Sequence, residues 1–443
     1  MASRKKVLGK LPVVASFPES QEAITFDAPR QIGRYSVGGA NREYIDDACN
    51  KMYLRSDIEW KGSRWEGPKW NLYDGFEKAV RRDWSEEDPL QNLLKWLVRH
   101  GDEVIQLGSA NETPSSPRQQ FVRPDFICSR EALKAFMCTP FSPSDEWMVQ
   151  ARLHDGVIYL RNVPTPAEKE RLKKEFHQRP ISWKGRFYRN MVTRLRGAPP
   201  EENEDVDETQ TYHAVLRGKL GLYDIVFEAE MMAIDTSQDS ETDCEEPYLE
   251  FRARPGVHQL KKYREHFSKY VLLKWWSQAR LAGVPSVLCA SYNKDNIIEY
   301  VEKFQVSDIP EIGREHDWSE QKCLQFLHEV LDFIKAIVTD NQPSNFDAVN
   351  LQFRHKTTES MTRPAFSQTE VASPPVEEVV GSKCIVESKV QSLKGRKHQG
   401  ALETGRRLQL RPTREAAQPL PLATVAPRTP PTPPVSQPPQ QLA

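Results

Sequence analysis

Long apolar stretches are absent from this chain. No run approaches the ~18 uncharged apolar residues that a membrane-spanning helix needs, although 38% of the 443 residues are hydrophobic. The apolar stretch that follows the basic N-terminus, residues 11–17, is short and contains Pro12. We therefore expect neither a membrane-spanning segment nor a secretory signal peptide.

Paired cysteines and several catalytic motifs are missing as well. The seven cysteines contain no CxxC pair and are odd in number, which argues against a disulfide framework and against a zinc ribbon. The ten histidines show no HxxxH spacing, and no glycine-rich phosphate loop or GxSxG elbow occurs. A reducing intracellular compartment fits this composition best.

An excess of charge of either sign is also lacking. The chain carries 61 Lys and Arg against 62 Asp and Glu, so that its formal charge is -1. The field of the whole molecule therefore selects no partner, and any nucleic-acid surface has to be local. Two acidic stretches, residues 201–208 and 239–246, lack the glycine-turn spacing of a calcium-binding EF-hand loop. We interpret them as solvated loops.

Proline is concentrated at the C-terminal end. Ten of the 33 prolines lie in residues 411–443, and the apolar periodicity fades near Pro343. A segment of this composition buries too little apolar area to offset its ordering entropy. We predict a flexible N-terminus over residues 1–14, a folded domain over 15–342, and a disordered, proline-rich, basic tail over 343–443.

Helices are predicted where capping residues precede apolar residues at a period of 3.6. Asp88 and Pro89 suit a helix start, and Gly101 is expected to end that helix. Thr165 and Glu168 have the spacing of a capping box. The predicted helices are 89–101, 165–178, 260–282 and 317–338.

Strands are predicted where β-branched and aromatic residues are dense. They lie mainly between the predicted helices, which indicates an α/β or α+β domain of roughly 330 residues. The predicted strands are 156–163, 212–216, 222–234, 248–254 and 284–292.

Two of these strands carry acidic residues in a telling pattern. One ends in Phe227-Glu-Ala-Glu230-Met-Met232, and the next reads Tyr248-Leu-Glu250-Phe-Arg252. Strand alternation places Glu250 and Arg252 on the same face. In a metal-dependent nuclease, inward carboxylates on neighbouring strands hold divalent ions that activate water, while a cation supports the nucleophile or phosphate. The spacing alone is common in strands.

The surrounding sequence is more specific. Over residues 15–340 the chain resembles the decapping-exoribonuclease (DXO) family, and the run Leu272-Leu-Lys-Trp-Trp-Ser-Gln278 followed by Gly283-Val-Pro285 is its most specific part. The resemblance implies two β-sheets flanked by helices around a nuclease-like core. It also implies removal of aberrant 5′ caps from RNA and 5′→3′ degradation with Mg or Mn. Further matching segments are 124–130, 138–141 and 156–160.

The departures from this family lie in its acidic motifs. The resemblance implies four acidic metal ligands, of which Glu230 and Glu250 remain. Arg189 stands in place of the glutamate of a Gly-x-x-x-Glu motif that begins at Gly185, and Met232 stands in place of the aspartate of Glu-x-Asp. The family's Glu-x-Lys has become Glu250-Phe-Arg252, while Arg130 and Gln278 match the family.

These substitutions disfavour a divalent ion. Two unit charges ~4 Å apart at an effective dielectric of ~20 interact by about 4 kcal/mol, and a divalent ion feels roughly twice that from Arg189. Arg252 stays protonated, and the thioether of Met232 is a poor ligand for a hard ion. We predict a pseudo-enzyme without catalytic residues or cofactor, in which Arg189 pairs with Glu230 and Glu250.

Some members of the family that have lost its catalytic motifs act in the insect germline, and the loss of acidic motifs in this chain resembles theirs. It implies a nuclear protein that shields nascent RNA 5′ ends at piRNA-producing loci and suppresses termination, splicing and decay. The implied partners are RNA 5′ ends and a chromatin complex of the Rhino/Deadlock type. The implied RNA contacts are Arg130, Arg252 and Gln278, each of which could instead serve in a structural salt bridge or core hydrogen bond.

Other interpretations stay open. The chain could be a residually active, metal-dependent decapping hydrolase that uses one Mg or Mn on Glu230 and Glu250. It could also be a protein-interaction scaffold whose cleft has no role. The basic and aromatic stretch of residues 60–70 could stack RNA bases, although a segment that covers the core is the more common arrangement. Trp275 and Trp276 are expected to pack in the core.

Overall fold

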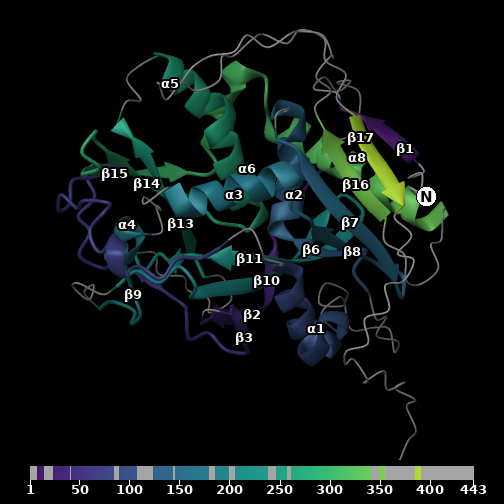
Figure 1. The fold of residues 1–443 in the computed structure, drawn as a ribbon, viewed down its shortest axis with the longest axis horizontal. Coiled ribbons are helices and arrows are strands. Elements are labelled where there is room, and N and C mark those ends of the chain that lie inside the picture. Colours follow the sequence, from purple (N-terminus) through teal and green to yellow (C-terminus); the bar gives the residue numbers. More distant parts are fainter. Residues whose placement is uncertain are drawn as a thin grey trace, which may run out of the picture. The chain divides into compact units, whose positions relative to one another are not determined.

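The computed structural model describes residues 7–13, 23–39, 41–83, 89–106, 123–142, 145–178, 185–198, 205–237, 246–256, 261–340, 349–354 and 385–390. These residues form two β-sheets with helices packed against them (Figure 1). The expected mixed α/β class with two sheets flanked by helices is therefore confirmed.

The larger sheet has ten strands. Most neighbours are antiparallel, but β6 runs parallel to both β8 and β11. In spatial order the strands are β1 (Val7–Pro12), β17 (Ile385–Val390), β16 (Val349–Arg354), β7 (Trp147–His154), β8 (Val157–Asn162), β6 (Phe126–Ser129), β11 (Tyr223–Met231), β10 (Thr211–Leu220), β2 (Arg30–Gly38) and β3 (Glu43–Ile45).

The smaller sheet has seven strands. Its centre is the parallel pair β13 and β14, and β12 joins the edge of β13 in antiparallel fashion. In spatial order the strands are β5 (Arg64–Trp65), β15 (Ile298–Gln305), β14 (Ser286–Tyr292), β13 (Tyr248–Pro255), β12 (Ala233–Ile234), β4 (Tyr53–Leu54) and β9 (Val192–Thr193).

Helices cover both faces of the larger sheet. The described helices are α1 (Pro89–Gln106), α2 (Arg130–Cys138), α3 (Pro166–Gln178), α4 (Arg186–Met191), α5 (Lys261–His266), α6 (Leu272–Leu281), α7 (Ile309–Gly313) and α8 (Glu320–Asp340). In the part of the chain described here, none of them is long and apolar enough to cross a membrane.

The main core lies between the larger sheet and α2, α6 and α8. Trp276 is 1% exposed in this core and Trp275 is 8% exposed, which confirms their expected packing role. The capping box before α3 is also confirmed, because the hydroxyl of Thr165 accepts a hydrogen bond from the backbone N–H of Glu168 at 3.1 Å. Gly283, with a φ of 68°, follows α6 in the left-handed conformation, as expected for a helix C-terminus.

The opposite face of the larger sheet is covered by α1. Gly33 in β2 makes room for the indole of Trp96, because a Cβ at that position would lie 2.0 Å from the ring. The prediction that Gly101 ends this helix is wrong, since α1 continues to Gln106. Its last turn is held by the burial of Val104 and by Arg217, whose guanidinium donates to the carbonyl of Val104 at 2.6 Å.

A third apolar cluster lies on the face of the smaller sheet opposite the main core. Trp65 is buried in it, and Trp60 and Trp70 pack against it. The guanidinium of Arg55 lies 5.8 Å from the ring centre of Trp65 and 5.6 Å from that of Trp70. This part of the basic and aromatic stretch therefore covers the core, which favours the packing interpretation over base stacking.

The fold extends beyond the boundary expected at residue 342. Val349, Leu351 and Phe353 of β16 alternate along the strand and are all buried against β7 and the main core. β17 pairs with β16 on one side and with β1 on the other, so residues 7–12, expected in a flexible N-terminus, also form a strand. The proline-rich stretch 411–443 lies outside the described residues.

Two further helix predictions need correction. Residues 260–282 were expected to form one regular helix, but Phe267–Val271 form a π-helical turn between α5 and α6. The last long helix begins at Glu320, and its capping hydroxyl comes from Ser319, which accepts from the backbone N–H of Lys322 at 3.3 Å. Asp317 precedes it in the left-handed region with a φ of 63°.

Candidate functional site

The acidic residues Glu230 and Glu250 lie where the two sheets meet. β11 of the larger sheet ends at Met231 and β12 of the smaller sheet begins at Ala233, so the chain passes from one sheet to the other at Met232. Glu230 therefore lies near the end of β11 in one sheet, while Glu250 lies within β13 of the other. The predicted strand 222–234 is divided at this junction: its second part, β12, pairs with β13 as expected, but the part that carries Glu230 belongs to the other sheet.

Both carboxylate oxygens of Glu250 are occupied by guanidinium groups. Its Oε1 accepts from Nη1 of Arg130 at 3.0 Å, and its Oε2 accepts from Nη2 of Arg252. The Glu250 side chain is 2% exposed. The pairing of Glu250 with Arg252 confirms that the two side chains share a face of β13. At this depth each charge needs a partner, because an unpaired buried ion is strongly unfavourable.

Glu230 is held by an arginine that the sequence analysis did not single out. Nη1 of Arg82 donates to Oε2 of Glu230 at 2.7 Å, and the Arg82 side chain is 5% exposed. Arg130 adds a bond from Nη2 to the backbone carbonyl of Glu230 at 3.2 Å. We call Arg82, Arg130 and Arg252 with Glu230 and Glu250 the arginine cluster. Arg82 comes from a loop 148 residues away along the chain, and no local pattern indicates it.

Met232 occupies the junction with its sulfur turned toward β13. The backbone N–H of Phe251 donates to Sδ of Met232 at 3.1 Å, and Nη1 of Arg252 lies 4.0 Å from the same sulfur. The residue is 6% exposed. The thioether therefore accepts a backbone hydrogen bond within the position where the family resemblance implies an aspartate.

Arg189 lies on the short helix α4 and is 8% exposed. The neighbouring Tyr188 hydroxyl donates to the carbonyl of Met232 at 2.8 Å. Burial and the charge of Glu230 raise the pKa of Tyr188, while the charge of Arg189 acts to lower it. Arg189 and Glu230 thus both lie close enough to act on this hydroxyl. The pairing of Arg189 with both glutamates stays a prediction, since the described partners of Glu250 are Arg130 and Arg252.

This donor set does not suit a hard divalent cation. Mg and Mn prefer several oxygen ligands, whereas the junction offers two carboxylates already bonded to guanidinium groups, a thioether and further positive charge. Within the described residues, no group of three or more His, Cys, Asp or Glu side chains is arranged to hold a metal ion.

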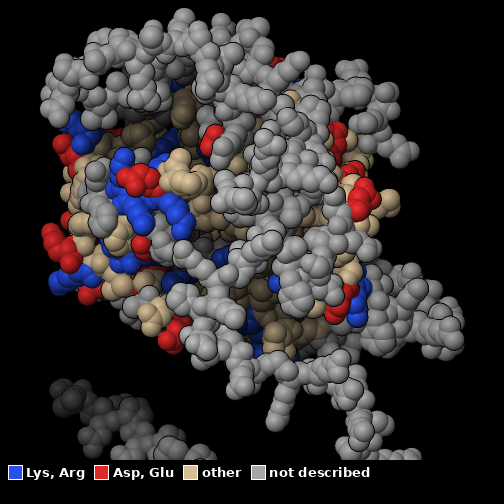
Figure 2. Space-filling model, turned by 45° about the vertical axis from the view of Figure 1, so that its right-hand side comes forward, with Lys and Arg blue, Asp and Glu red and all other residues tan. Residues whose placement is uncertain are grey.

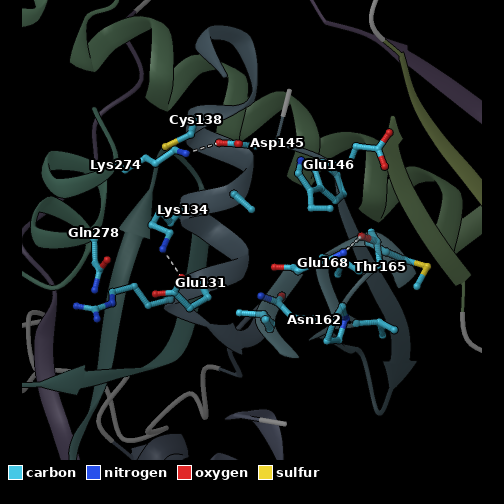
Figure 3. A pocket seen from close by; sticks show the side chains of 18 of the residues that line it. Glu131, Lys134, Cys138, Asp145, Glu146, Asn162, Thr165, Glu168, Lys274 and Gln278 are labelled. Atoms are coloured by element: carbon cyan, nitrogen blue, oxygen red, sulfur yellow. Dashed lines mark hydrogen bonds and ion pairs between the residues drawn. The ribbon is translucent and has the colours of Figure 1, made fainter. Parts of the chain in front are cut away.

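A cavity of about 840 Å³ opens beside the arginine cluster. Arg130, Gln278, Glu230 and Met232 line it, whereas Glu250 and Arg252 are not among its described lining residues. Figure 3 shows Lys134, Lys274 and Gln278 on one side, and Asn162, Thr165 and Glu168 across from them. The cavity thus lies between α2 and α6 on one side and β8 and α3 on the other.

Two exposed ion pairs form the α2 and α6 side of the cavity. Lys134 contacts Glu131, and Nζ of Lys274 lies 2.7 Å from Oδ2 of Asp145 (Figure 3). We call these four residues the lysine wall. Burial acts to raise the pKa of Glu131, but the charges of Lys134 and Arg130 lower it below its ordinary value. Burial also raises the pKa of the thiol of Cys138, which lines the cavity, to about 11. This cysteine is therefore not an activated nucleophile.

Unsatisfied polar atoms lie at the cavity. Nε of Arg130, Oγ of Ser142 and Oδ1 of Asn162 are buried and have no hydrogen-bond partner among the described residues, and all three residues line the cavity. A buried polar atom without a partner costs free energy, so these atoms are ready to bond a ligand. Of the three RNA contacts expected from the sequence, Arg130 and Gln278 reach the cavity, and Arg252 lies behind them in the arginine cluster.

A buried His–Glu pair at the cavity was also missed. Nδ1 of His213 lies 2.8 Å from Oε2 of Glu228, and its Nε2 lies 2.9 Å from the hydroxyl of Thr211. His213 and Glu228 both line the cavity. Period-2 alternation could have indicated Glu228, because it lies two residues before Glu230 on the same face of β11.

The charges near the site are mixed in sign. Figure 2 shows Lys and Arg side chains gathered on one half of a described face, with Asp and Glu side chains among them. This mixture agrees with a formal charge of -1 for the whole chain. A polyanion would therefore depend on particular positions rather than on the overall field.

Comparison with protein families finds one match over most of the chain. A family model described as RAI1-like PD-(D/E)XK nuclease matches residues 27–374. The decapping and exoribonuclease protein of Xenopus laevis is 27% identical over 323 residues, which cover 71% of this chain and 77% of that protein. The human protein of the same name is 27% identical over 320 residues, covering 71% and 76%.

An insect relative is more distant. Protein cutoff of Drosophila melanogaster is 22% identical over 229 residues, covering 50% of this chain and 57% of that protein. This match confirms a distant resemblance to the insect member that the sequence indicated.

Solved structures share the fold. Rai1 of S. pombe in complex with 3′-FADP has a TM-score of 0.57 at 17% identity, covering 86% of this chain and 99% of its own. Rai1 of Candida albicans in complex with pU5-Mn2+ has a TM-score of 0.61 at 15% identity, covering 79% and 90%. At these identities the likeness establishes the fold, and it confirms the expected two-sheet architecture.

Proposed function

We propose that this chain, which belongs to the RAI1-like PD-(D/E)XK nuclease family, is a catalytically inactive member that binds and shields RNA 5′ ends. Members of this family share the two-sheet fold, and the cavity of this chain lies beside the junction of its sheets. The loss of activity is our inference from the residues at the junction of the sheets.

One observation carries the proposal. The two carboxylates that remain at the junction are bonded to Arg82, Arg130 and Arg252 rather than being open to a cation. A divalent ion would have to displace guanidinium groups from Glu250, which is 2% exposed, and would gain no oxygen ligand from Met232. Without a metal ion, nothing at the junction would activate the attacking water or stabilise the leaving oxygen, so the chain would not hydrolyse RNA in the way that the family does.

The cavity itself still suits an RNA 5′ end. Lys134 and Lys274 line it, and each is paired with a carboxylate that a phosphate could displace. The amide of Gln278 can bond a ribose or phosphate oxygen. Relatives support this choice of ligand: Candida albicans Rai1 is in complex with pU5-Mn2+ and S. pombe Rai1 with 3′-FADP. Bound RNA would be enclosed without being cut.

The cellular part of the proposal rests on Drosophila Protein cutoff, which is 22% identical to this chain. We place the protein in the nucleus of germline cells, at piRNA-producing loci, where shielding of nascent 5′ ends would suppress termination, splicing and decay. Its partners there would be RNA 5′ ends and a chromatin complex of the Rhino/Deadlock type.

Titration calorimetry with Mn alone tests the inactive centre. We expect the wild-type protein to take up no Mn at the junction. A variant that combines Arg189→Glu, Met232→Asp and Arg252→Lys should bind Mn and gain thermal stability, by about 2.7 kcal/mol at a concentration 100-fold above its Kd. Arg196→Glu, an exposed charge reversal on the loop after α4, is the control.

The same preparations answer the binding question. The wild type should retain a 5′-monophosphorylated RNA uncleaved in the presence of Mn. Mn uptake at one site by the wild type, or cleavage of the RNA, would overturn the inactive centre and favour residual decapping. An intact protein that binds no RNA would instead overturn the shielding function and leave a protein-interaction scaffold.

A further inference from the structure

A polar and aromatic stripe leads away from the cavity along one continuous helical segment. Gln278 and Lys274 on α6 line the cavity, and Tyr270, His266 and Lys262 follow at intervals of four residues. Residues four apart are neighbours on the surface of a helix, and because a helix has 3.6 residues per turn, a row of this spacing winds slowly around it. The rings of His266 and Tyr270, whose centres are 5.4 Å apart, confirm that the face continues through the π-helical turn. We call these five residues the exit stripe.

The outer half of this segment is basic and open to solvent. Residues 261–270 contain four Lys or Arg residues and one acidic residue, Glu265, and α5 has no buried residue. Lys261 pairs with Glu265 at 3.7 Å. Lys262 and Lys269 have no ion pair with any described residue, although Nζ of Lys269 lies 5.2 Å from the ring centre of Tyr270. These charges differ from the wall lysines, both of which are paired with carboxylates.

The π-helical turn fixes this segment to the fold. Phe267 packs edge-on against Trp275, with ring centres 5.2 Å apart, and the guanidinium of Arg254 lies 4.6 Å from the Phe267 ring centre. The hydroxyl of Ser268 lies 2.6 Å from Nε2 of His316. The backbone carbonyl of Ser268 accepts a hydrogen bond from the indole N–H of Trp318 at 3.3 Å. Such insertions in helices are frequent at functional sites. The basic end of the stripe is thus held in place rather than free.

We propose that the exit stripe binds the single-stranded RNA that follows a 5′ end held in the cavity, an inference that rests on the proposed function. Lys262 of the stripe and Lys269, whose ammonium group lies beside the Tyr270 ring, contact phosphates. The Tyr270 and His266 rings offer stacking surfaces for bases, which is how single strands are bound without sequence preference. The sixteen steps from Lys262 to Gln278 span ~24 Å at ~1.5 Å per residue. At ~3.4 Å per stacked nucleotide this accommodates about seven nucleotides.

The composition of the stripe favours a nucleic acid over a lipid surface. A membrane-bound helix presents an apolar face of Leu, Phe or Trp below its basic residues, whereas Phe267 is turned into the fold and Tyr263, 47% exposed, is the large apolar-bodied residue that α5 presents to solvent. Aromatic rings between unpaired lysines, in line with a cavity, match the requirements of a single strand.

Binding of two RNA lengths by the full chain tests the inference. The probes are 5′-monophosphorylated RNAs of about 5 and about 15 nucleotides, which lie near the two ends of known single-strand site sizes. The variant is Lys262→Gln with Lys269→Gln. Its control is Lys95→Gln with Arg99→Gln, an exposed basic pair on α1, which Figure 1 draws at the opposite end of the molecule from α5.

We expect the wild type and the control to bind the longer RNA more tightly than the shorter one. The exit-stripe variant should bind the longer RNA roughly tenfold more weakly, with affinity for the shorter RNA within about twofold of wild type. Its slope of log affinity against log salt should fall in magnitude by about 1.4, because each lost phosphate contact contributes about 0.7 for a single strand.

The outcomes separate the inference from the function on which it rests. Equal binding of the longer RNA by wild type and variant would overturn the exit stripe while leaving 5′-end shielding in place. Failure of the wild type to bind either RNA would overturn both. Binding of phosphatidylserine vesicles that the variant loses, with RNA affinity unchanged, would assign the stripe to a lipid surface and overturn the inference.

Discussion

The arginine cluster and the lysine wall border the same cavity with the same two kinds of charge, yet they differ in depth. In the cluster, the side chains of Arg130 and Glu250 are 4% and 2% exposed. In the wall, Lys274 and Asp145 are 45% and 48% exposed. The cluster uses planar guanidinium groups, which donate several bonds in fixed directions, whereas the wall uses flexible ammonium groups.

This difference shows which charges hold the fold and which can meet a ligand. A buried ion is tolerated only when its partners replace the water it has lost, so the cluster cannot release Arg130 or Glu250 at low cost. An exposed pair gains little from its partner and can exchange it for a phosphate. Under the proposed function, the cluster therefore serves the stability of the fold, and the wall is the part of the cavity that can contact a ligand.

Removal of one cluster arginine gives the largest expected effect. Arg130→Met should lower the free energy of unfolding by about 3–5 kcal/mol, because Glu250 keeps one partner in a buried position. Lys134→Met, on the same helix, should cost less than about 1 kcal/mol, since the Lys134 side chain is 24% exposed. Urea unfolding of both variants measures the difference. Similar losses in the two variants would contradict the contrast between cluster and wall.

A buried carboxylate away from the cavity tests whether burial alone, without an arginine partner, makes an ion pair important for the free energy of unfolding. Asp235 is 1% exposed and is bonded to Nζ of Lys303 at 2.9 Å. Burial acts to raise its pKa, but bonds from Ser237 and Lys303 lower it below the ordinary value. Asp235→Asn should lower the free energy of unfolding by about 2–3 kcal/mol near neutral pH, the range for hydrogen bonds to a charged group.

The pH dependence of that loss follows from the sign of the shift. Because the folded pKa of Asp235 is lower than the unfolded one, its stabilisation is complete above about pH 3.9 and disappears as pH falls through the folded pKa. The difference between Asp235→Asn and wild type in the free energy of unfolding should therefore shrink as the pH falls below about 3.9. Asp57→Asn, which removes a carboxylate that is 53% exposed and pairs with Arg55, is the control and should show a smaller difference over the same pH range. A pH-independent difference would mean that the carboxylate charge is not what stabilises this site.

The smallest expected effect concerns the wall. Lys134→Gln combined with Lys274→Gln should weaken binding of a 5′-monophosphorylated RNA by about tenfold, or roughly 1.4 kcal/mol, because the cavity loses two positive charges. The free energy of unfolding should stay within about 1 kcal/mol of wild type. Lys335→Gln is the matched control, since it breaks a similar pair with Asp125 outside the cavity. Unchanged RNA affinity would show that the wall does not contact the ligand.

Local patterns in the sequence indicated much of this fold. Period-2 alternation placed Glu250 and Arg252 on one face, and the structure bonds them to each other. The capping box at Thr165 and the core position of Trp276 were also predictable. These features depend on residues only a few positions apart, for which the geometry of a helix or strand fixes the outcome.

Features that depend on distant residues were not predictable in this way. Arg82 reaches Glu230 across 148 residues, and β16 joins β7 after an interval of nearly two hundred residues. The interruption of residues 260–282 by a π-helical turn was missed as well, because it depends on the contacts of Phe267 and Ser268 with other elements. The prediction that Gly101 ends α1 failed for a similar reason. The bond that holds the last turn comes from Arg217, which is 113 residues from Val104, and no local pattern indicates it.

The sequence by itself predicted that Arg189 and Met232 stand where the family resemblance implies acidic residues, since the chemistry at a position is a property of the residue there. It also determined the family, through motifs that span most of the chain. Only the tertiary structure decided what the remaining carboxylates do. Glu230 and Glu250 lie in different sheets, and the guanidinium groups that hold them come from a loop, a helix and a strand that only folding brings to one junction.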